Sequence, residues 1–466
     1  MKKSILLSFI LLSILQLAQA KTPPNVVLIF VDDMGWGDVG YHGVNTIHTP
    51  QIDQLANEGV YFSQGYVTAS ICGPSRAGLI TGKYQQRFGC FGNSKHGIPN
   101  EEKLLFHYLK EQGYQTASIG KWHLGEGEGR LMPNERGVDY FYGFLGGSHD
   151  YTKSAKDENV KRSLLKPIYE NGEIQPPIQN DNGYLTDLFT EKAISFIDKN
   201  KENPFCLYLA YNAVHHPWQV PQKYVDALDH LEVGEERKHF AGMVYALDVG
   251  IGQIREALKE NGIDDNTIIF FISDNGTPAG QGFKEPRRKK RGETTMSSPG
   301  PFNGFKGSTY EGGIRIPFIA HYPKHFPENK HSEVPVISLD VLPTILNQIG
   351  NGLGSDELEG KDLLELIDGE EERPLFWARD GDIAVRYQDW KLSINNKQGS
   401  GAIELYDLKN DPGEWKDIAS SNPEKVKQLL HFFQEWDQKN TKVTNHNGLA
   451  PKYRAKIEKY LEELGR

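Results

Sequence analysis

The residues best suited to chemistry lie between Cys72 and Gly82, in the string Cys-Gly-Pro-Ser-Arg-Ala-Gly-Leu-Ile-Thr-Gly. Gly73 and Pro74 predict a bend, and the residues after Pro74 can continue as a helix with proline in its first turn. Cys72 would then lie just outside a helix N-terminus, where the helix dipole and free N–H groups favour negative charge. Such a place suits a nucleophile or a metal-bound oxygen. A lone cysteine there can equally be a buried structural residue in front of an ordinary helix.

Oxygen-bearing side chains end two apolar runs elsewhere in the chain. Asp32 and Asp33 end the first run, and Asp274 and Asn275 end a later one. Adjacent carboxylates repel one another, so a pair at a strand end usually faces a cation. Together the four are hard ligands, which suit Ca²⁺ or Mg²⁺ better than Zn²⁺. Each pair alone is also compatible with a solvated loop or an ordinary turn.

Basic side chains also follow strand-like runs. Lys121 and His123 follow one run, His215 and His216 follow another, and Lys306 lies in a glycine-rich approach to a further run. Each of these motifs alone could be a loop with incidental basic groups. If the strands are parallel, their carboxyl ends meet at one edge of the sheet, and these side chains then gather with the carboxylates.

The apolar pattern predicts the fold class. Nearly continuous runs rich in β-branched residues, typical of strands buried on both faces, cover 25–31, 116–119, 205–210, 267–272 and 316–320. Helical periodicity covers 49–58, 104–112, 185–199 and 243–261. Buried strands that alternate with helices predict an α/β sandwich with functional residues at the strand ends.

The pattern changes near residue 373. Short alternating runs, separated by turn residues and followed by helical patterns from Pro423 onward, lie at 375–378, 383–386, 390–394 and 404–408. They predict a small antiparallel sheet with a packed helix. We therefore expect a catalytic domain over 21–365 and a C-terminal subdomain over 366–466.

Residues 1–20 are typical of a secretory signal peptide, with Lys2 and Lys3 before an apolar stretch and Ala18-Gln19-Ala20 as a cleavage site. The apolar stretch is too short to remain in a bilayer, so we expect an exported protein, periplasmic or secreted, with no membrane partner. The net charge of −10 argues against nucleic acid as a partner and requires a local positive site for any anionic substrate. Three cysteines do not make a disulfide framework.

The string at 72–82 resembles the signature of the formylglycine-dependent sulfatases of the alkaline-phosphatase superfamily, in which this cysteine is oxidised after synthesis to formylglycine (3-oxoalanine). Segments similar to that family also lie at 32–35, 49–56, 120–125, 273–276, 306–315, 405–408 and 411–412. The resemblance covers most of residues 24–412. It implies an alkaline-phosphatase-like sandwich, with a large mixed central sheet flanked by helices and a small C-terminal subdomain.

The resemblance also implies roles for the residues above. Ca²⁺ would be bound by Asp32, Asp33, Asp274, Asn275 and the modified residue 72. The sulfate group would be surrounded by Arg76, Lys121, His123, His215 and Lys306. Val214 departs from the family, in which a proline commonly precedes this histidine, and this leaves His216 as the alternative to the preferred His215.

In the mechanism that the resemblance implies, one hydroxyl of hydrated formylglycine attacks sulfur with the help of Ca²⁺ and a carboxylate such as Asp274. His215 or Lys306 protonates the departing sugar oxygen, and His123 helps to deprotonate the second hydroxyl, which expels sulfate. The expected partners are a sulfated carbohydrate, such as the algal galactan carrageenan, and a formylglycine-generating enzyme. A phosphatase or phosphonate hydrolase of the same superfamily, or a catalytically silent glycan-binding protein, stays an alternative.

One further segment, 284–291, carries six positive charges in eight residues. Runs of charge are usually solvated. This run lies between Asp274 and Lys306, however, which leads to the hypothesis that it contacts neighbouring sulfate groups on a polymeric substrate.

Overall fold

A computed structural model describes residues 23–126, 132–159, 164–179, 183–278, 296–350, 357–369, 372–379, 381–396, 399–441 and 453–464. The predicted signal peptide at 1–20 and the basic run at 284–291 lie outside these residues. No helix in this described part combines the length and hydrophobicity that crossing a membrane requires.

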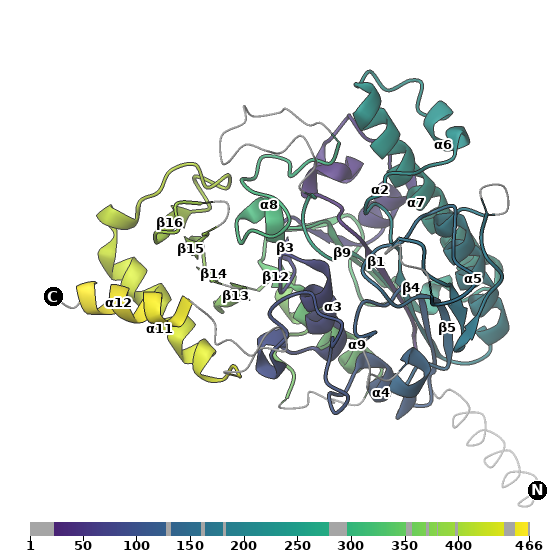
Figure 1. Ribbon diagram of the computed structural model, residues 1–466, viewed down its shortest axis with the longest axis horizontal. Coiled ribbons are helices and arrows are strands. Elements are labelled where there is room, and N and C mark those ends of the chain that lie inside the picture. Colours follow the sequence, from purple (N-terminus) through teal and green to yellow (C-terminus); the bar gives the residue numbers. More distant parts are fainter. Residues whose placement is uncertain are drawn as a thin grey trace, which may run out of the picture.

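Within the described residues, ten strands form one large mixed sheet in the middle of the larger part of the molecule (Figure 1). In spatial order they are β11 (Lys330–Ser332), β2 (Val60–Phe62), β10 (Phe318–His321), β9 (Thr267–Ser273), β1 (Asn25–Val31), β8 (Phe205–Ala210), β4 (Gln115–Lys121), β5 (Tyr140–Phe144), β6 (Tyr169–Glu170) and β7 (Glu173–Ile174). A separate pair is formed by β3 (Gly65–Tyr66) and β12 (Val336–Ile337).

The four central strands β9, β1, β8 and β4 run parallel to one another. Their carboxyl ends therefore lie at one edge of the sheet, which confirms the arrangement expected for the motifs that follow them. β10 pairs antiparallel with β9, so its amino end lies at this same edge. The glycine-rich segment that carries Lys306 approaches β10 from that side.

Helices cover both faces of the sheet (Figure 1). The α-helices are α2 (Pro50–Asn57), α3 (Cys72–Thr81), α4 (Leu105–Lys110), α5 (Leu185–Asn200), α6 (Gln222–Asp226), α7 (Glu235–Glu260), α8 (Glu311–Ile314), α9 (Val341–Gln348), α10 (Leu363–Leu366), α11 (Pro423–Gln438) and α12 (Tyr453–Leu464). Short 3₁₀ turns lie at Trp36–Asp38, Gly40–His42, Gln85–Phe88, Pro133–Arg136, Asp264–Asn266, Ser338–Asp340 and Ala419–Ser421.

Alternate residues of β1 enter two different cores. Val27 and Ile29 pack in the core that includes α2, α5 and α7, whereas Val26 and Leu28 pack in the core that includes α3, α4 and α9. All four side chains are fully buried, so β1 is apolar throughout rather than alternating. This explains why a continuous apolar run predicted the strand.

The predicted strands agree with the observed ones to within two residues. β4 extends to Lys121, so this lysine ends the strand instead of following it. α7 begins at Glu235, eight residues before the predicted start. The prediction missed this start because the first turn carries Glu235 and Glu236 and lacks apolar periodicity. Acidic residues suit that position because of the helix dipole. The short strands β2, β5 and β11 were not predicted.

The C-terminal part contains the predicted antiparallel sheet. Within the described residues it has four strands in the order β13 (Leu375–Arg379), β14 (Asp382–Tyr387), β15 (Trp390–Ile394) and β16 (Glu404–Asp407). α11 packs against this sheet through Leu429, Leu430 and Phe433 in a separate core. A domain boundary near residue 365 stays a prediction.

A buried ionic group joins the two parts of the molecule. Lys391 Nζ, on β15, lies 2.7 Å from Glu311 Oε1 at the start of α8 and 2.8 Å from Glu414 Oε1. Glu414 also accepts a hydrogen bond from the backbone N–H of Glu311 at 2.7 Å. All three side chains are buried, so the lysine balances charge that water cannot reach.

The segment next to Lys306 is held by the same sheet. Arg379 NH1 donates to the carbonyl oxygen of Gly307 at 2.7 Å, and the N–H of Thr309 donates to Asn395 Oδ1 at 2.9 Å. Tyr310 OH donates to Glu404 at 2.6 Å. The C-terminal sheet therefore fixes the backbone that presents Lys306.

Replacing Lys391 tests this connection. Lys391→Ala is expected to lower the free energy of unfolding by about 3–5 kcal/mol, because Glu414 would stay buried without its cation and Glu311 would lose this ion pair and keep the one with Arg315. Chemical denaturation followed by fluorescence measures the change. Lys416 is exposed, and Lys416→Ala should change stability by less than about 0.5 kcal/mol. A loss in Lys391→Ala no larger than in this control would contradict the expectation.

Candidate active site

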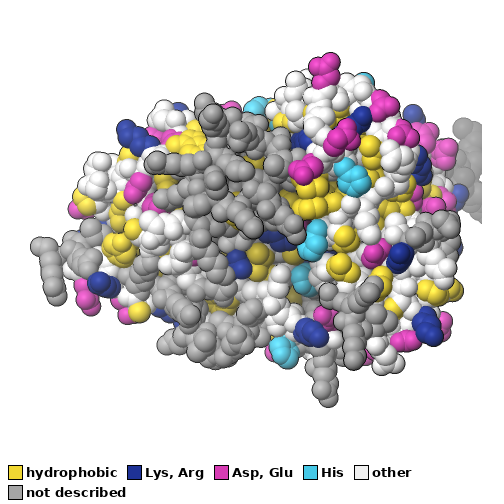
Figure 2. Space-filling model, turned by 45° about the horizontal axis from the view of Figure 1, so that its top comes forward, with side chains coloured by type: hydrophobic (Ala, Val, Ile, Leu, Met, Phe, Trp, Pro, Cys, Tyr) yellow, Lys and Arg dark blue, Asp and Glu magenta, His cyan; other side chains and the backbone are white. Residues whose placement is uncertain are grey.

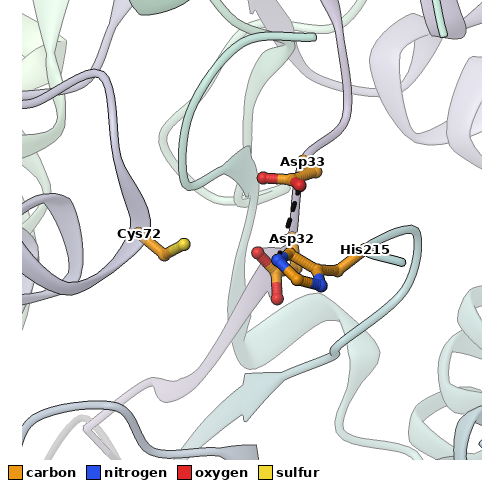
Figure 3. A group of neighbouring side chains, drawn as sticks. All are labelled: Asp32, Asp33, Cys72 and His215. Carbon is orange, nitrogen blue, oxygen red and sulfur yellow. Dashed lines mark ion pairs between the residues drawn. The ribbon is translucent and has the colours of Figure 1, made fainter. Parts of the chain in front are cut away.

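The predicted site residues gather at the carboxyl edge of the parallel strands. Asp32 and Asp33 follow β1, Lys121 ends β4 and His123 follows it, His215 follows β8, Asp274 and Asn275 follow β9, Cys72 and Arg76 lie on α3, and Lys306 precedes α8. Figure 3 shows Cys72, Asp32, Asp33 and His215 around one space, into which the Cys72 sulfur points. One ligand atom from each of these four lies within 4.8 Å of the others.

Cys72 is the first residue of α3, one residue further into the helix than predicted. Pro74 lies in the first turn, as the sequence predicted. The Cys72 side chain is buried, and burial has the largest effect on its thiol, whose pKa it raises. The positive charges of Lys121 and Lys306 lower this pKa, and the negative charges of Asp274 and Asp32 raise it. The unmodified thiol is therefore protonated at neutral pH and is a poor nucleophile. Cys72, Cys90 and Cys206 form no disulfide with one another.

Asp32 and Asp274 are paired with buried cations. Lys121 Nζ lies 2.6 Å from Asp32 Oδ2, and Arg76 holds Asp274 Oδ2 through NH2 at 2.8 Å and Nε at 3.0 Å. Arg76 NH1 also donates to the carbonyl oxygen of Lys121 at 3.0 Å. Burial, followed by repulsion from Asp32, raises the pKa of Asp274 to about 6. Two donors of Arg76 thus share one carboxylate oxygen, as charge-assisted hydrogen bonds that hold this carboxylate in place.

Asp33 is shared by residues from three other segments. Lys306 Nζ lies 2.5 Å and Asn275 Nδ2 2.8 Å from Asp33 Oδ1, while His215 Nε2 lies 3.7 Å from Asp33 Oδ2. Burial alone would raise the pKa of Asp33, but the charges of Lys306 and His215 hold it well below the usual range. Asp33 is therefore ionised throughout the physiological pH range.

Two buried oxygens of the cluster could bind a cation. Three carboxylates (Asp32, Asp33 and Asp274) face three cationic side chains (Arg76, Lys121 and Lys306), so their formal charges cancel. Asp32 Oδ1 and Asn275 Oδ1 are nevertheless buried without a hydrogen-bond partner among the described residues. Buried oxygens without partners are rare in proteins. A hard divalent cation would satisfy both and would give the site the net positive charge that an anion requires.

The backbone beneath the cluster is fixed by contacts between distant segments. The N–H of Asp32 donates to Ala213 O at 2.8 Å, and the N–H of Val214 donates to Asp32 O at 2.6 Å. Asp33 and His123 have positive φ angles of 63° and 54°, a conformation that costs energy for residues other than glycine. The N–H of Asp33 donates to Asp274 Oδ1 at 3.2 Å and that of His123 donates to Leu145 O at 3.0 Å, and these contacts help to hold the two residues in strained conformations.

The structure distinguishes His215 from His216. His215 is buried in the cluster, and its Nδ1 lies 2.6 Å from the carbonyl oxygen of His216. Since a carbonyl only accepts, Nδ1 carries the proton and Nε2 faces Asp33. Burial lowers the pKa of His215 to about 3. His216 is exposed, with its ring centroid 4.4 Å from that of His215.

Two residues that position the site were not among the sequence predictions. The buried Asp38 accepts from Arg237 NH1 at 2.6 Å and from the N–H of Gly35 at 2.9 Å, which fixes the loop after Asp33. The Tyr151 hydroxyl lies 2.5 Å from Asn212 O and 2.8 Å from His215 O, beneath the histidine loop. Asp38 has a signal in the spacing Gly35-x-Gly37-Asp38, whereas Tyr151 has none.

Comparisons with known proteins agree with this geometry. The sulfatase family model matches residues 24–351, and a model of the C-terminal region of N-sulphoglucosamine sulphohydrolase matches residues 304–442. N-acetylgalactosamine-6-sulfatase of Mus musculus is 33% identical, over 78% of this chain and 70% of that protein. Arylsulfatase A of Homo sapiens is 32% identical, over 87% of this chain and 86% of that protein.

A solved structure is similar over nearly the whole length. The crystal structure of Ps i-CgsB in complex with k-i-k-neocarrahexaose has a TM-score of 0.80 and 33% identity, covering 95% of this chain and 98% of that one. The family model alone covers more than half of this chain. The chain therefore belongs to the sulfatase family, within the alkaline-phosphatase superfamily, and is a sulfuric ester hydrolase.

Proposed function

We propose that this protein is an exported, Ca²⁺-dependent sulfatase that removes O-sulfate groups from a sulfated polysaccharide or its oligosaccharides, with a formylglycine made from Cys72 as nucleophile. The observation that carries the proposal is the buried cluster in which Cys72 faces Asp32, Asp33 and His215 within 4.8 Å. The raised pKa of the thiol argues against an unmodified Cys72 as the nucleophile, because burial keeps the thiol protonated.

The substrate class is supported by the similar proteins. The 33% identical structure holds k-i-k-neocarrahexaose, and a 33% identical relative is named as a sulfatase of N-acetylgalactosamine-6-sulfate groups. We therefore propose a sulfated galactan such as carrageenan as the first substrate to test. The pattern of residues 1–20 supports export. A formylglycine-generating enzyme would be the partner that matures Cys72.

The acidic and amide residues fit the proposed metal site. Asp32, Asp33, Asp274, Asn275 and residue 72 would hold Ca²⁺. The aldehyde hydrate at residue 72 would supply the nucleophilic oxygen, and Ca²⁺ would supply positive charge to the sulfate oxygens. Arg76 and Lys121 keep Asp274 and Asp32 in place through contacts of 2.6–3.0 Å. Because these groups are fixed before substrate arrives, they need no reorganisation as charge develops.

The remaining basic groups suit proton transfer and anion binding. His215 Nε2 faces the cluster because Nδ1 carries the ring proton and donates it to the His216 carbonyl. Because the pKa of His215 is lowered to about 3, Nε2 carries no proton at neutral pH and would have to take one up before it could protonate the ester oxygen. Lys306 Nζ, beside Asp33, stays charged because Asp33 raises the pKa of Lys306 against the effect of burial. It would stabilise negative charge on the sulfate. His123, with a buried Nδ1 that has no hydrogen-bond partner among the described residues, would act on the second hydroxyl.

Comparing a sulfate ester with the matching phosphate ester distinguishes sulfatase from phosphatase activity. We expect kcat/KM for 4-nitrophenyl sulfate to exceed that for 4-nitrophenyl phosphate, because the charge of the site suits a monoanionic ester. Sulfate release from carrageenan oligosaccharides, measured by ion chromatography, tests the substrate class. Faster turnover of the phosphate would favour the phosphatase alternative instead.

The role of residue 72 is tested by removing its side chain. Cys72→Ala is expected to lower kcat for sulfate esters by about 10³-fold or more, as the loss of a nucleophile does in other hydrolases. Cys90 is also buried but is not part of the cluster, so Cys90→Ala should retain wild-type activity. Comparable activity in Cys72→Ala and wild type would rule out residue 72 as the nucleophile.

Metal dependence has two independent readouts. Chelation with EGTA should abolish activity and lower the melting temperature, and Ca²⁺ should restore both. Ca²⁺ at about 100 times its Kd would stabilise the fold by about 2.7 kcal/mol, because it binds only the folded site. Asp32→Asn removes a ligand charge and should weaken the thermal response to Ca²⁺. An unchanged melting curve and full activity in EGTA would exclude the metal site.

A further inference from the structure

Two exposed polar side chains flank the buried cluster. The proposed chemistry gives neither of them a role, and the sequence named only His216, as the alternative to His215. Asn93, on the segment that follows α3, contacts Gly73, the residue after Cys72, and His216 follows His215 after β8. The cluster between them is compact, since Cys72 Sγ and a ring nitrogen of His215 lie within 4.8 Å of each other. Asn93 and His216 therefore lie next to the Cys72 side and the His215 side of the cluster, respectively.

Asn93 is fixed against the nucleophile residue. Its Oδ1 accepts a hydrogen bond from the N–H of Gly73 at 3.0 Å. A Cβ on Gly73 would lie 2.9 Å from Asn93 Oδ1 and 3.7 Å from His123 Cε1, so the amide and the imidazole border the same point. Because the N–H of Gly73 requires an acceptor, the Nδ2 donor of Asn93 turns away from the helix.

The segment that carries Asn93 is also tied to the loop that carries His123. The N–H of Ile98 donates to Leu124 O at 3.1 Å, and the N–H of Glu126 donates to Lys95 O at 2.9 Å. Both bonds join the residues that follow Asn93 to the residues that follow His123. The side chain of Asn93 is therefore exposed on a fixed backbone, as a selective contact requires.

His216 lies on the other side, against the proposed proton-transfer group. Its ring centroid is 4.4 Å from that of His215, with 32° between the ring planes. Its carbonyl oxygen fixes Nδ1 of His215, so the position of the two rings is coupled. The His216 ring remains exposed and has both nitrogens able to bond a ligand.

From this arrangement we propose that Asn93 and His216 bind hydroxyl groups of the sugar whose sulfate enters the cluster, and so determine which sulfate ester is cleaved. This inference rests on the proposed function. Both side chains are neutral hydrogen-bonding groups, and a sugar presents hydroxyls on either side of the ester, whereas a simple aryl ester presents none. Figure 2, in which the top of Figure 1 comes forward, shows histidine and basic side chains near the middle of this face.

The test compares two kinds of ester in the same variants. Asn93→Ala and His216→Ala are assayed, as full chains matured in the cell, with carrageenan oligosaccharides and with 4-nitrophenyl sulfate. The ratio of kcat/KM for sugar ester to aryl ester is expected to fall by about tenfold in each variant, equivalent to about 1.4 kcal/mol of lost transition-state binding. His216→Gln, which keeps a donor and an acceptor, should recover part of the ratio.

His325 supplies a matched control. It is an exposed histidine just after β10, whose carboxyl end lies at the opposite edge of the sheet because β10 is antiparallel. His325→Ala should leave the ratio unchanged. Thermal melting of every variant shows whether a change in rate reflects loss of folded protein, and the ratio removes that effect because both esters are turned over by the same molecules.

The outcomes separate this inference from the proposed function. A wild-type enzyme that cleaves neither ester overturns both. Cleavage of the aryl sulfate but of no sulfated sugar leaves the sulfatase activity standing and overturns the inference. The inference also fails if wild type cleaves both esters and the ratio in Asn93→Ala and His216→Ala matches that in His325→Ala.

Discussion

The site depends on the mutual neutralisation of charges that water cannot reach. Asp32, Asp33 and Asp274 are buried at the ends of two adjacent strands, where their repulsion would oppose folding. Arg76 and Lys121 offset this repulsion from α3 and β4, and Lys306 does so from the segment before α8. Loss of one partner would leave a buried charge uncompensated. The need for neutrality therefore links the fold directly to the geometry of the active site.

The sheet and the C-terminal part bring these charges together in different ways. Parallel pairing of β9, β1, β8 and β4 places the residues that follow them at one edge. Lys306 comes instead from an irregular segment, whose backbone is held by Arg379 and Asn395 of the C-terminal sheet. The C-terminal sheet thus helps to maintain the charge balance, although the three carboxylates and their three cationic partners all lie outside it.

The sequence predicted the strands well because β1 and its neighbours are buried on both faces and read as continuous apolar runs. The rule that residues after parallel strands share one edge also predicted that most of the acidic and basic residues would meet. Arg76 lies on α3 instead and was assigned only through the family resemblance. The sequence did not predict the ion pair between Asp38 and Arg237, which lie 199 residues apart in the sequence, or the contact of Tyr151 with the loop that carries His215. Such contacts depend on how loops pack, which local periodicity does not encode.

We propose that residue 72 reacts as formylglycine within this buried group of charges. The most direct measurement is the mass of the peptide that carries residue 72, isolated from active protein produced in a cell that matures sulfatases. We expect an aldehyde, or its hydrate, in place of the thiol, in proportion to the specific activity of the preparation. Fully active protein that carries an unmodified Cys72 would contradict this proposal.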